Sequence, residues 1–344
     1  MNDSLLQQLN AIPPGLIDCP AEQLHTLLPK PTLIHLEGKR QQPLFISVLL
    51  HGNEPTGLLA VQALLKKYQD RVLPRSLSIF FGNVQAAAKQ QRRLDGQVDF
   101  NRIWLGTLML DCPETEMAQQ IVDIMVQRNV FASVDIHNNT GLNPHYGCIN
   151  RIDNRFLQLA TLFARFVVYF TSPKGVQSGA FAEHCPALTL ECGRPNQEYG
   201  VQHAFEFIDS CLNLAELVDH PIHSQDVDLF HTVAQIKVKD DINFSFNDEA
   251  ANFLLSKDLE TLNFTEVPAG TIMGVVQDKD HLPIVAKDEQ GRAVTSRFFT
   301  IDNNQLVIKR KTMPSMLTLD ERVIRQDCLC YLMERFPLAT DVTC

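Results

Sequence analysis

Three short polar segments place metal-binding and acidic side chains directly after runs of apolar residues. His51 and Glu54 lie in HGNEPTG, which follows the apolar run FISVLL. His137 lies in VDIHNNTG and Glu191 in ALTLECGRP, each at the end of a further apolar run. Imidazole nitrogen and carboxylate oxygen are ligands of zinc, and a catalytic zinc site has three protein ligands plus water. A His and a carboxylate three residues apart can therefore converge on one cation.

Each of these signals also has a purely structural interpretation. HGNEPTG can be an ordinary turn in which Glu54 favours a helix N-terminus. His137 can be a strand-end histidine satisfied by loop groups, and Glu191 can pair with Arg194. A phosphate-binding loop is excluded, because Leu58 and Leu59 stand where such a loop needs Lys and Ser or Thr.

The positions of these residues at the ends of expected strands favour the functional interpretation over the structural one. His51, His137 and Glu191 all follow the C-terminal ends of apolar runs that we expect to be parallel strands. In open α/β sheets the ligand crevice lies outside those ends. Asp135 shares a strand face with His137, because side chains alternate along a strand, and it is a candidate for orienting the site. We therefore expect one functional site at this edge of the sheet.

A fourth segment, VDFNRIW, supplies groups that can bind an anion. It contains Asn101 and Arg102, and Arg92 and Arg93 come shortly before it. An arginine binds a carboxylate with two parallel hydrogen bonds, so an Asn–Arg pair can hold a substrate carboxylate. A solvated loop arginine is the alternative.

The elements that must position these residues alternate between short apolar runs and amphipathic stretches. This alternation predicts an α/β fold with a mixed, largely parallel sheet and helices on both faces. We expect an edge strand at 32–38. The other expected strands are 45–50, 77–81, 131–136, 166–170 and 187–190, and the expected helices are 58–68, 115–127, 156–163 and 201–218.

The pattern changes after the polar stretch 220–228. Short apolar runs separated by turn residues then predict strands, whereas periodicity does not decide between a helix and two strands for 320–335. We therefore expect a catalytic domain at 1–225 and a smaller β-rich domain at 226–344.

Composition limits the possible partners and the cellular compartment. The net charge of -10 gives no general attraction for phosphate backbones, so nucleic acid is not an expected partner. Nine scattered cysteines favour reduced thiols, and the first residues lack the basic start of a signal peptide. No apolar run is long enough to span a membrane. We expect a cytoplasmic protein without a membrane partner; its oligomeric state stays open.

Taken together, HGNEPTG, DFNRIW, DIHNNTG and TLECGRP resemble the succinylglutamate desuccinylase/aspartoacylase family, a branch of the zinc carboxypeptidase-like fold. The four motifs occur in the family's order. The resemblance implies one zinc ion bound by His51, Glu54 and His137.

The resemblance also assigns roles to the other motif residues. It implies that Asn101 and Arg102 bind a substrate carboxylate, and that Glu191 activates water and protonates the leaving amine. A family arginine that polarises the scissile carbonyl matches Arg93 best, although the spacing to Asn101 is one residue longer than usual, and Arg92 is the alternative. The implied substrate is a small anionic N-acyl amino acid.

Two other functions fit the same residues. A zinc metallocarboxypeptidase acting on peptides uses the same metal and the same arginines. A non-catalytic metal-binding or ligand-binding protein on this fold is a second alternative, but such a protein has no need of a general base at Glu191. The acyl group, the physiological metal and a second metal are not determined by the sequence. His145, which follows His137 in TGLNPHYG, has no assigned role.

Overall fold

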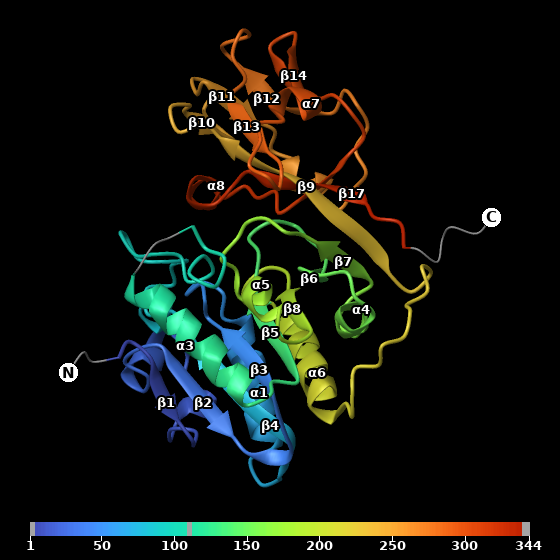
Figure 1. Cartoon of the computed structure of the whole chain (residues 1–344). Coiled ribbons are helices and arrows are strands. Elements are labelled where there is room, and N and C mark those ends of the chain that lie inside the picture. Colours follow the sequence, from blue (N-terminus) through green and yellow to red (C-terminus); the bar gives the residue numbers. More distant parts are fainter. Residues whose placement is uncertain (1–3, 109–111, 339–344) are drawn as a thin grey trace. The chain divides into compact units, whose positions relative to one another are not determined.

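The computed structural model describes residues 4–108 and 112–338 of the chain (Figure 1). This part of the chain forms two compact units. The first contains residues 4–138 and 145–228, and the second contains residues 139–144 and 229–338. Residues 139–144, which begin two positions after His137, therefore belong to the second unit, although the expected domain boundary at 225 placed them in the first.

The first unit is built on a mixed sheet in which five of the seven neighbouring strand pairs are parallel. A largely parallel sheet was expected from the alternation of apolar runs and helices. In spatial order its strands are β1 (Gln7–Leu9), β2 (Thr32–Leu36), β4 (Leu73–Phe81), β3 (Gly38–Val48), β5 (Ala132–His137), β8 (Ala187–Glu191), β6 (Tyr146–Ile149) and β7 (Phe166–Tyr169).

Helices cover both faces of this sheet. Helix α1 (Thr56–Lys67) lies against the face that carries Val48 and Ile136, because a Cβ built on Gly57 would meet both of these side chains. Helix α5 (Gln177–Phe181) lies on the opposite face, where the rings of Phe45 and Phe181 stack 4.7 Å apart. The remaining longer helices are α3 (Pro113–Gln127), α4 (Asn154–Thr161) and α6 (Glu198–Asn213).

Two strands differ from the sequence-based expectation. Strand β2 is not at an edge, because β1 pairs with its outer side. Strand β6 was not predicted, and it runs antiparallel to β8 at one end of the parallel set. Both β1 and β6 have only three or four residues, which is too short for a clear period in the sequence.

The second unit consists mainly of antiparallel strands. Segment 320–335 is neither one helix nor two strands, because it forms α8 (Glu321–Gln326) followed by β17. Four of the strands are β9 (Asp228–Val238), β13 (Ile284–Lys287), β16 (Met313–Ser315) and β17 (Cys330–Arg335). A five-stranded sheet has the order β10 (Phe244–Ser245), β11 (Phe253–Leu255), β12 (Ile272–Val276), β15 (Gln305–Ile308) and β14 (Phe299–Asp302).

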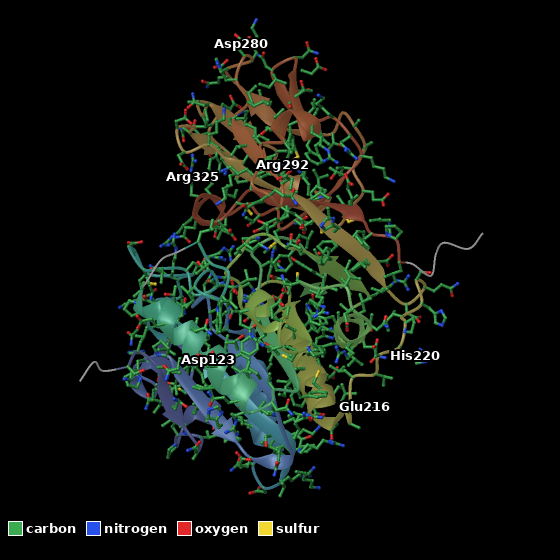
Figure 2. All side chains as sticks on the ribbon, viewed as in Figure 1. Asp123, Glu216, His220, Asp280, Arg292 and Arg325 are labelled. Carbon is green, nitrogen blue, oxygen red and sulfur yellow. The ribbon has the colours of Figure 1, made fainter. Side chains whose placement is uncertain are left out.

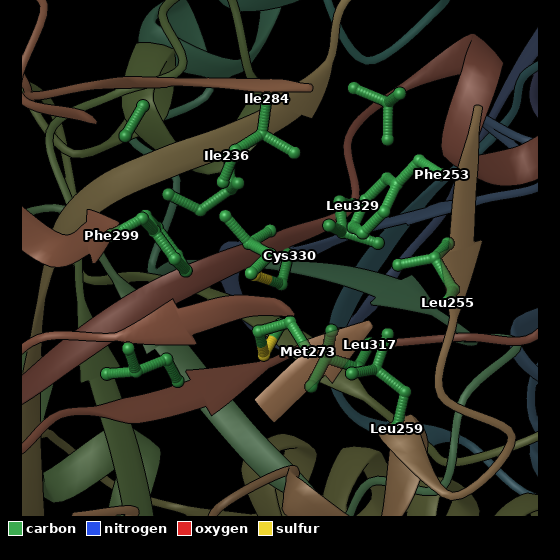
Figure 3. Close-up of a cluster of buried hydrophobic side chains, with 14 of the residues drawn as sticks. Ile236, Phe253, Leu255, Leu259, Met273, Ile284, Phe299, Leu317, Leu329 and Cys330 are labelled. Carbon is green, nitrogen blue, oxygen red and sulfur yellow. The ribbon is translucent and has the colours of Figure 1, made fainter. Parts of the chain in front are cut away.

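The second unit has its own hydrophobic core (Figure 3). Ile236, Phe253 and Met273 come from three different strands and are at most 2% exposed. Charged side chains such as Asp280 and Arg292 are exposed at the outside of the same unit (Figure 2). Within the described parts of the chain, every helix is too short or too polar to cross a membrane.

Candidate functional site

The ends of β3, β5 and β8 bring the predicted site residues to one edge of the sheet. His51 follows β3 after a sharp turn, and His137 is the last residue of β5. In the parallel pairing of β5 with β8, His137 lies directly opposite Glu191. Paired residues on neighbouring strands point to the same face, so Glu191 and His137 share a face of the sheet. Glu191 is 7% exposed.

His51, Glu54 and His137 form a buried cluster. Their ligand atoms all lie within 4.8 Å of one another. One Glu54 oxygen is 2.8 Å from Nδ1 of His51, and the other is 2.7 Å from Nδ1 of His137. Two imidazoles and one carboxylate make a donor set that zinc prefers. These three side chains therefore fit a divalent metal ion.

The outer nitrogen of each imidazole faces a second carboxylate. Nε2 of His137 lies 2.7 Å from Asp135, whose other oxygen accepts a hydrogen bond of 2.6 Å from the Ser47 hydroxyl. Nε2 of His51 lies 3.1 Å from Asp99. A histidine that binds a metal keeps its proton on the nitrogen that faces such an acceptor. Nδ1 is therefore the nitrogen that would face a bound metal in both imidazoles.

Electrostatic interactions within the cluster shift the pKa values of Glu54 and His137 in opposite directions. Burial alone would raise the pKa of Glu54, but His51 and His137 hold that pKa well below its usual range. Burial alone would lower the pKa of His137, whereas Asp135 and Glu54 raise it well above its usual value. Glu54 is thus an ionised ligand at neutral pH, while a metal ion must compete with protons for His137.

A tight backbone contact holds the HGNEPTG turn in place. The Gly52 amide donates to the carbonyl of Arg92, and a Cβ on Gly52 would lie 2.2 Å from the backbone nitrogen of Ala87. Any other residue here would push the turn away from the helix α2 (Val84–Ala87). Gly52 thereby allows the Arg92 segment to lie beside His51.

Arg92 and Arg93 point to different surroundings. The Arg92 guanidinium lies 3.1 Å from Asp99 and 3.8 Å from Glu54, and its side chain is 11% exposed. Arg93 donates to the carbonyl of Gln97, in its own loop. The family resemblance favoured Arg93 as the catalytic arginine, with Arg92 as the alternative, and the structure brings Arg92 to the metal-donor cluster. The sequence could not decide between the two arginines, because in an irregular loop the direction of a side chain does not follow from its position in the sequence.

Asn101 is buried next to His137, and its neighbour Arg102 is partly buried. The side-chain amide nitrogen of Asn101 is 3.3 Å from Nε2 of His137, and its oxygen accepts a hydrogen bond from the backbone amide of Gln177. Because Gln177 begins α5, that helix sets the orientation of the Asn101 amide. Arg102 donates to the carbonyl of Asn101.

Two residues that the sequence did not single out help to build the site. Asp99 lies two residues before Asn101, and its only sequence signal was its place in the same motif. Asn138 follows His137; its backbone amide donates to Glu54, and its side chain bonds both the Thr56 amide and the Gly193 carbonyl. Asn138 thereby links the turn before α1 to the loop after Glu191.

His145 packs against the loop after Glu191, where a Cβ on Gly193 would lie 3.3 Å from its Nε2. Its ring stacks on Tyr199 with centroids 4.6 Å apart and also lies close to His203. This packing agrees with a structural histidine.

The fold and the site together define an α/β protein with a His–Glu–His cluster at the C-terminal ends of its parallel strands. Residues 40–206 match the family model described as the succinylglutamate desuccinylase/aspartoacylase catalytic domain, and they contain every site residue discussed above. Over residues 40–206 the chain therefore matches the catalytic domain of the succinylglutamate desuccinylase/aspartoacylase family.

Solved structures share the fold at low sequence identity. Succinylglutamate desuccinylase from Chromobacterium violaceum aligns with a TM-score of 0.58 and 16% identity, covering 87% of this chain and 86% of that one. Murine aminoacylase 3 aligns with a TM-score of 0.56 and 13% identity, covering 87% and 96%. The product-bound ectoine utilization protein from Ruegeria pomeroyi gives 0.55 and 13%, covering 89% and 88%.

Proposed function

We propose that this protein hydrolyses the amide bond of a small N-acyl amino acid and uses one zinc ion held by His51, Glu54 and His137. The observation that carries the proposal is the convergence of these three donors beside Glu191, which lies opposite His137 in strand register. The names of the structural neighbours include a desuccinylase and an aminoacylase, which agrees with this reaction.

In this reaction the metal and the side chains of the site would have separate roles. A bound zinc ion supplies Lewis acidity, which polarises a carbonyl and makes water more acidic. The Glu191 carboxylate takes the proton of the attacking water and passes it to the nitrogen of the leaving amine. The Arg92 guanidinium stabilises negative charge that develops on the carbonyl oxygen. Arg102 and the Asn101 amide hold the substrate carboxylate and so fix its orientation.

The two units described above correspond, in this proposal, to a catalytic domain and a β-rich C-terminal domain. The eight cysteines of the described part are free thiols, which agrees with a reducing, cytoplasmic compartment. A small acid is the proposed partner, and neither nucleic acid nor a membrane is required.

Replacing Glu191 with Gln tests the proposal directly. We expect the variant to keep its zinc, because Glu191 is not a ligand, and to lose on the order of 100- to 10,000-fold in kcat, because the general base is gone. Zinc content by elemental analysis and hydrolysis of a panel of N-acetyl, N-succinyl and other N-acyl amino acids are measured on the same samples. Retained zinc with unchanged hydrolysis would contradict the role of Glu191.

The same panel, extended with short peptides, separates the alternatives. Hydrolysis of short peptides in preference to acylated amino acids would indicate a carboxypeptidase. Stoichiometric zinc without turnover of any amide, at wild-type Glu191, would indicate a binding protein. Wild-type protein that contains no zinc and shows no chelator-sensitive activity would overturn the proposal itself.

A further inference from the structure

We infer that Asp99 is a positioning residue that ties the metal ligand His51 to the substrate-binding groups Arg92 and Asn101. This inference rests on the proposed function, because it concerns the same site. One oxygen of Asp99 accepts from Nε2 of His51 at 3.1 Å and from the backbone amide of Asn101 at 2.8 Å. The other oxygen accepts from Arg92 at 3.1 Å.

The Asp99 carboxylate can hold all three groups because its two oxygens accept from different sides and are sheltered from water. Its side chain is 14% exposed. An ionised carboxylate only accepts hydrogen bonds, so the His51 nitrogen that faces it carries the proton.

The contact with His51 acts on the metal site. With the proton fixed on Nε2, the lone pair of the His51 ring lies on Nδ1, which faces the Glu54 side of the cluster. Asp135 makes the equivalent contact with His137. The two imidazoles are therefore oriented by carboxylates from different segments, one on a strand and one in the loop before Asn101.

The other two contacts act on the substrate side. Arg92 has a long flexible side chain, and its pair with Asp99 fixes the guanidinium near Glu54. The Asp99 hydrogen bond to the Asn101 amide fixes the backbone from which the Asn101 and Arg102 side chains extend. The carboxylate thus couples the position of the substrate to the position of the metal, which an amide hydrolase needs in order to align the attacking water with the carbonyl carbon.

Two substitutions separate these contacts. Asp99→Ala removes all three. In Asp99→Asn the side-chain oxygen is expected to take the position that faces His51 and Asn101, because the N–H groups of both residues point there and need an acceptor. Its NH2 group then faces Arg92, and two donors cannot pair. Asp95→Ala and Asp95→Asn are the matched controls, since Asp95 is an exposed acidic residue of the same loop.

The readouts are zinc affinity by competition with a chelator, the visible absorption spectrum of the cobalt(II)-loaded protein, and kcat and KM on the best N-acyl amino acid. We expect Asp99→Ala to bind zinc 10- to 100-fold more weakly and to change the cobalt spectrum. We expect Asp99→Asn to lose less than tenfold in zinc affinity but on the order of 100-fold in kcat, through the displaced Arg92. Both Asp95 variants should match the wild type.

Wild-type zinc affinity and an unchanged cobalt spectrum in Asp99→Ala would overturn the inference. If Asp99→Ala does not fold, Asp99→Asn decides, and an unchanged kcat in that variant would overturn the coupling to Arg92. Failure of the proposed function gives a different result, because then the wild-type protein itself lacks zinc or hydrolyses no amide.

Discussion

At the scale of single residues, the site depends on which of two adjacent arginines faces the cluster. Arg92 pairs with Asp99 and approaches Glu54, whereas Arg93 bonds the carbonyl of Gln97. Only a guanidinium near the metal donors can stabilise charge on a carbonyl bound there. The geometry therefore supports Arg92 for this role.

We expect Arg92→Ala to reduce kcat/KM by on the order of 100- to 1,000-fold, the usual cost of one lost donor to an oxyanion. Arg93→Ala should stay within about threefold of wild type, because the half-buried Arg93 bonds the carbonyl of Gln97 in its own loop and not the metal donors. Steady-state kinetics on both variants, with zinc content as the control, makes the comparison. A larger loss in the Arg93 variant would return the role to Arg93.

At the scale of elements, the site depends on how closely α1 approaches the strands that carry the histidines. Gly57, in the first turn of α1, has no Cβ, and a Cβ there would lie 2.9 Å from Val48 and 3.0 Å from Ile136. Those residues lie in β3 and β5, so the close approach holds the turn containing Glu54 against both strand ends.

Gly57→Ala is expected to lower the free energy of unfolding by about 1–3 kcal/mol, because the added methyl group overpacks this contact. The sign of the change in the free energy of unfolding tests the close contact, since Gly→Ala in an unhindered helix interior raises stability by about 0.5–1 kcal/mol. Urea denaturation of the variant gives the measurement, with Lys66→Ala at the exposed end of α1 as the control. A stabilised Gly57→Ala protein would show that α1 can shift without cost.

At the scale of the whole molecule, a buried and a half-buried histidine make folding sensitive to acid. Burial lowers the pKa of His35 to about 4, with a smaller contribution from Arg128; its Nδ1 lies 2.9 Å from the Ser78 hydroxyl. Burial likewise lowers the pKa of His145 to about 4. Both rings are therefore neutral in the folded chain at pH values where the unfolded chain binds protons.

The free energy of unfolding should therefore fall as the pH drops from about 6.5 toward 4, since the unfolded state takes up more protons. The stability that His35 contributes is present above its unfolded pKa of 6.5 and decreases below it, by on the order of 2 kcal/mol at pH 4. Urea titrations at several pH values check this, and His35→Gln should show a smaller slope. Equal slopes for the variant and the wild type would mean that His35 is not the responsible group.

The sequence by itself determined the main chemistry of the candidate site. His51, His137 and Glu191 follow apolar runs, and parallel strands bring their C-terminal ends to one edge whatever the details of packing. Local periodicity was therefore enough to bring these residues together and to predict a largely parallel α/β sheet.

Only the tertiary structure decided what lies in loops and short strands. Asp99 and Arg92 reach the site because the loop before Asn101 folds back onto the HGNEPTG turn, and a loop has no period from which that return can be predicted. Strands β1 and β6 are too short for their own signal and form through pairing with longer neighbours. The metal donors follow from chain-local pattern, whereas the groups that orient them depend on contacts between residues distant in sequence.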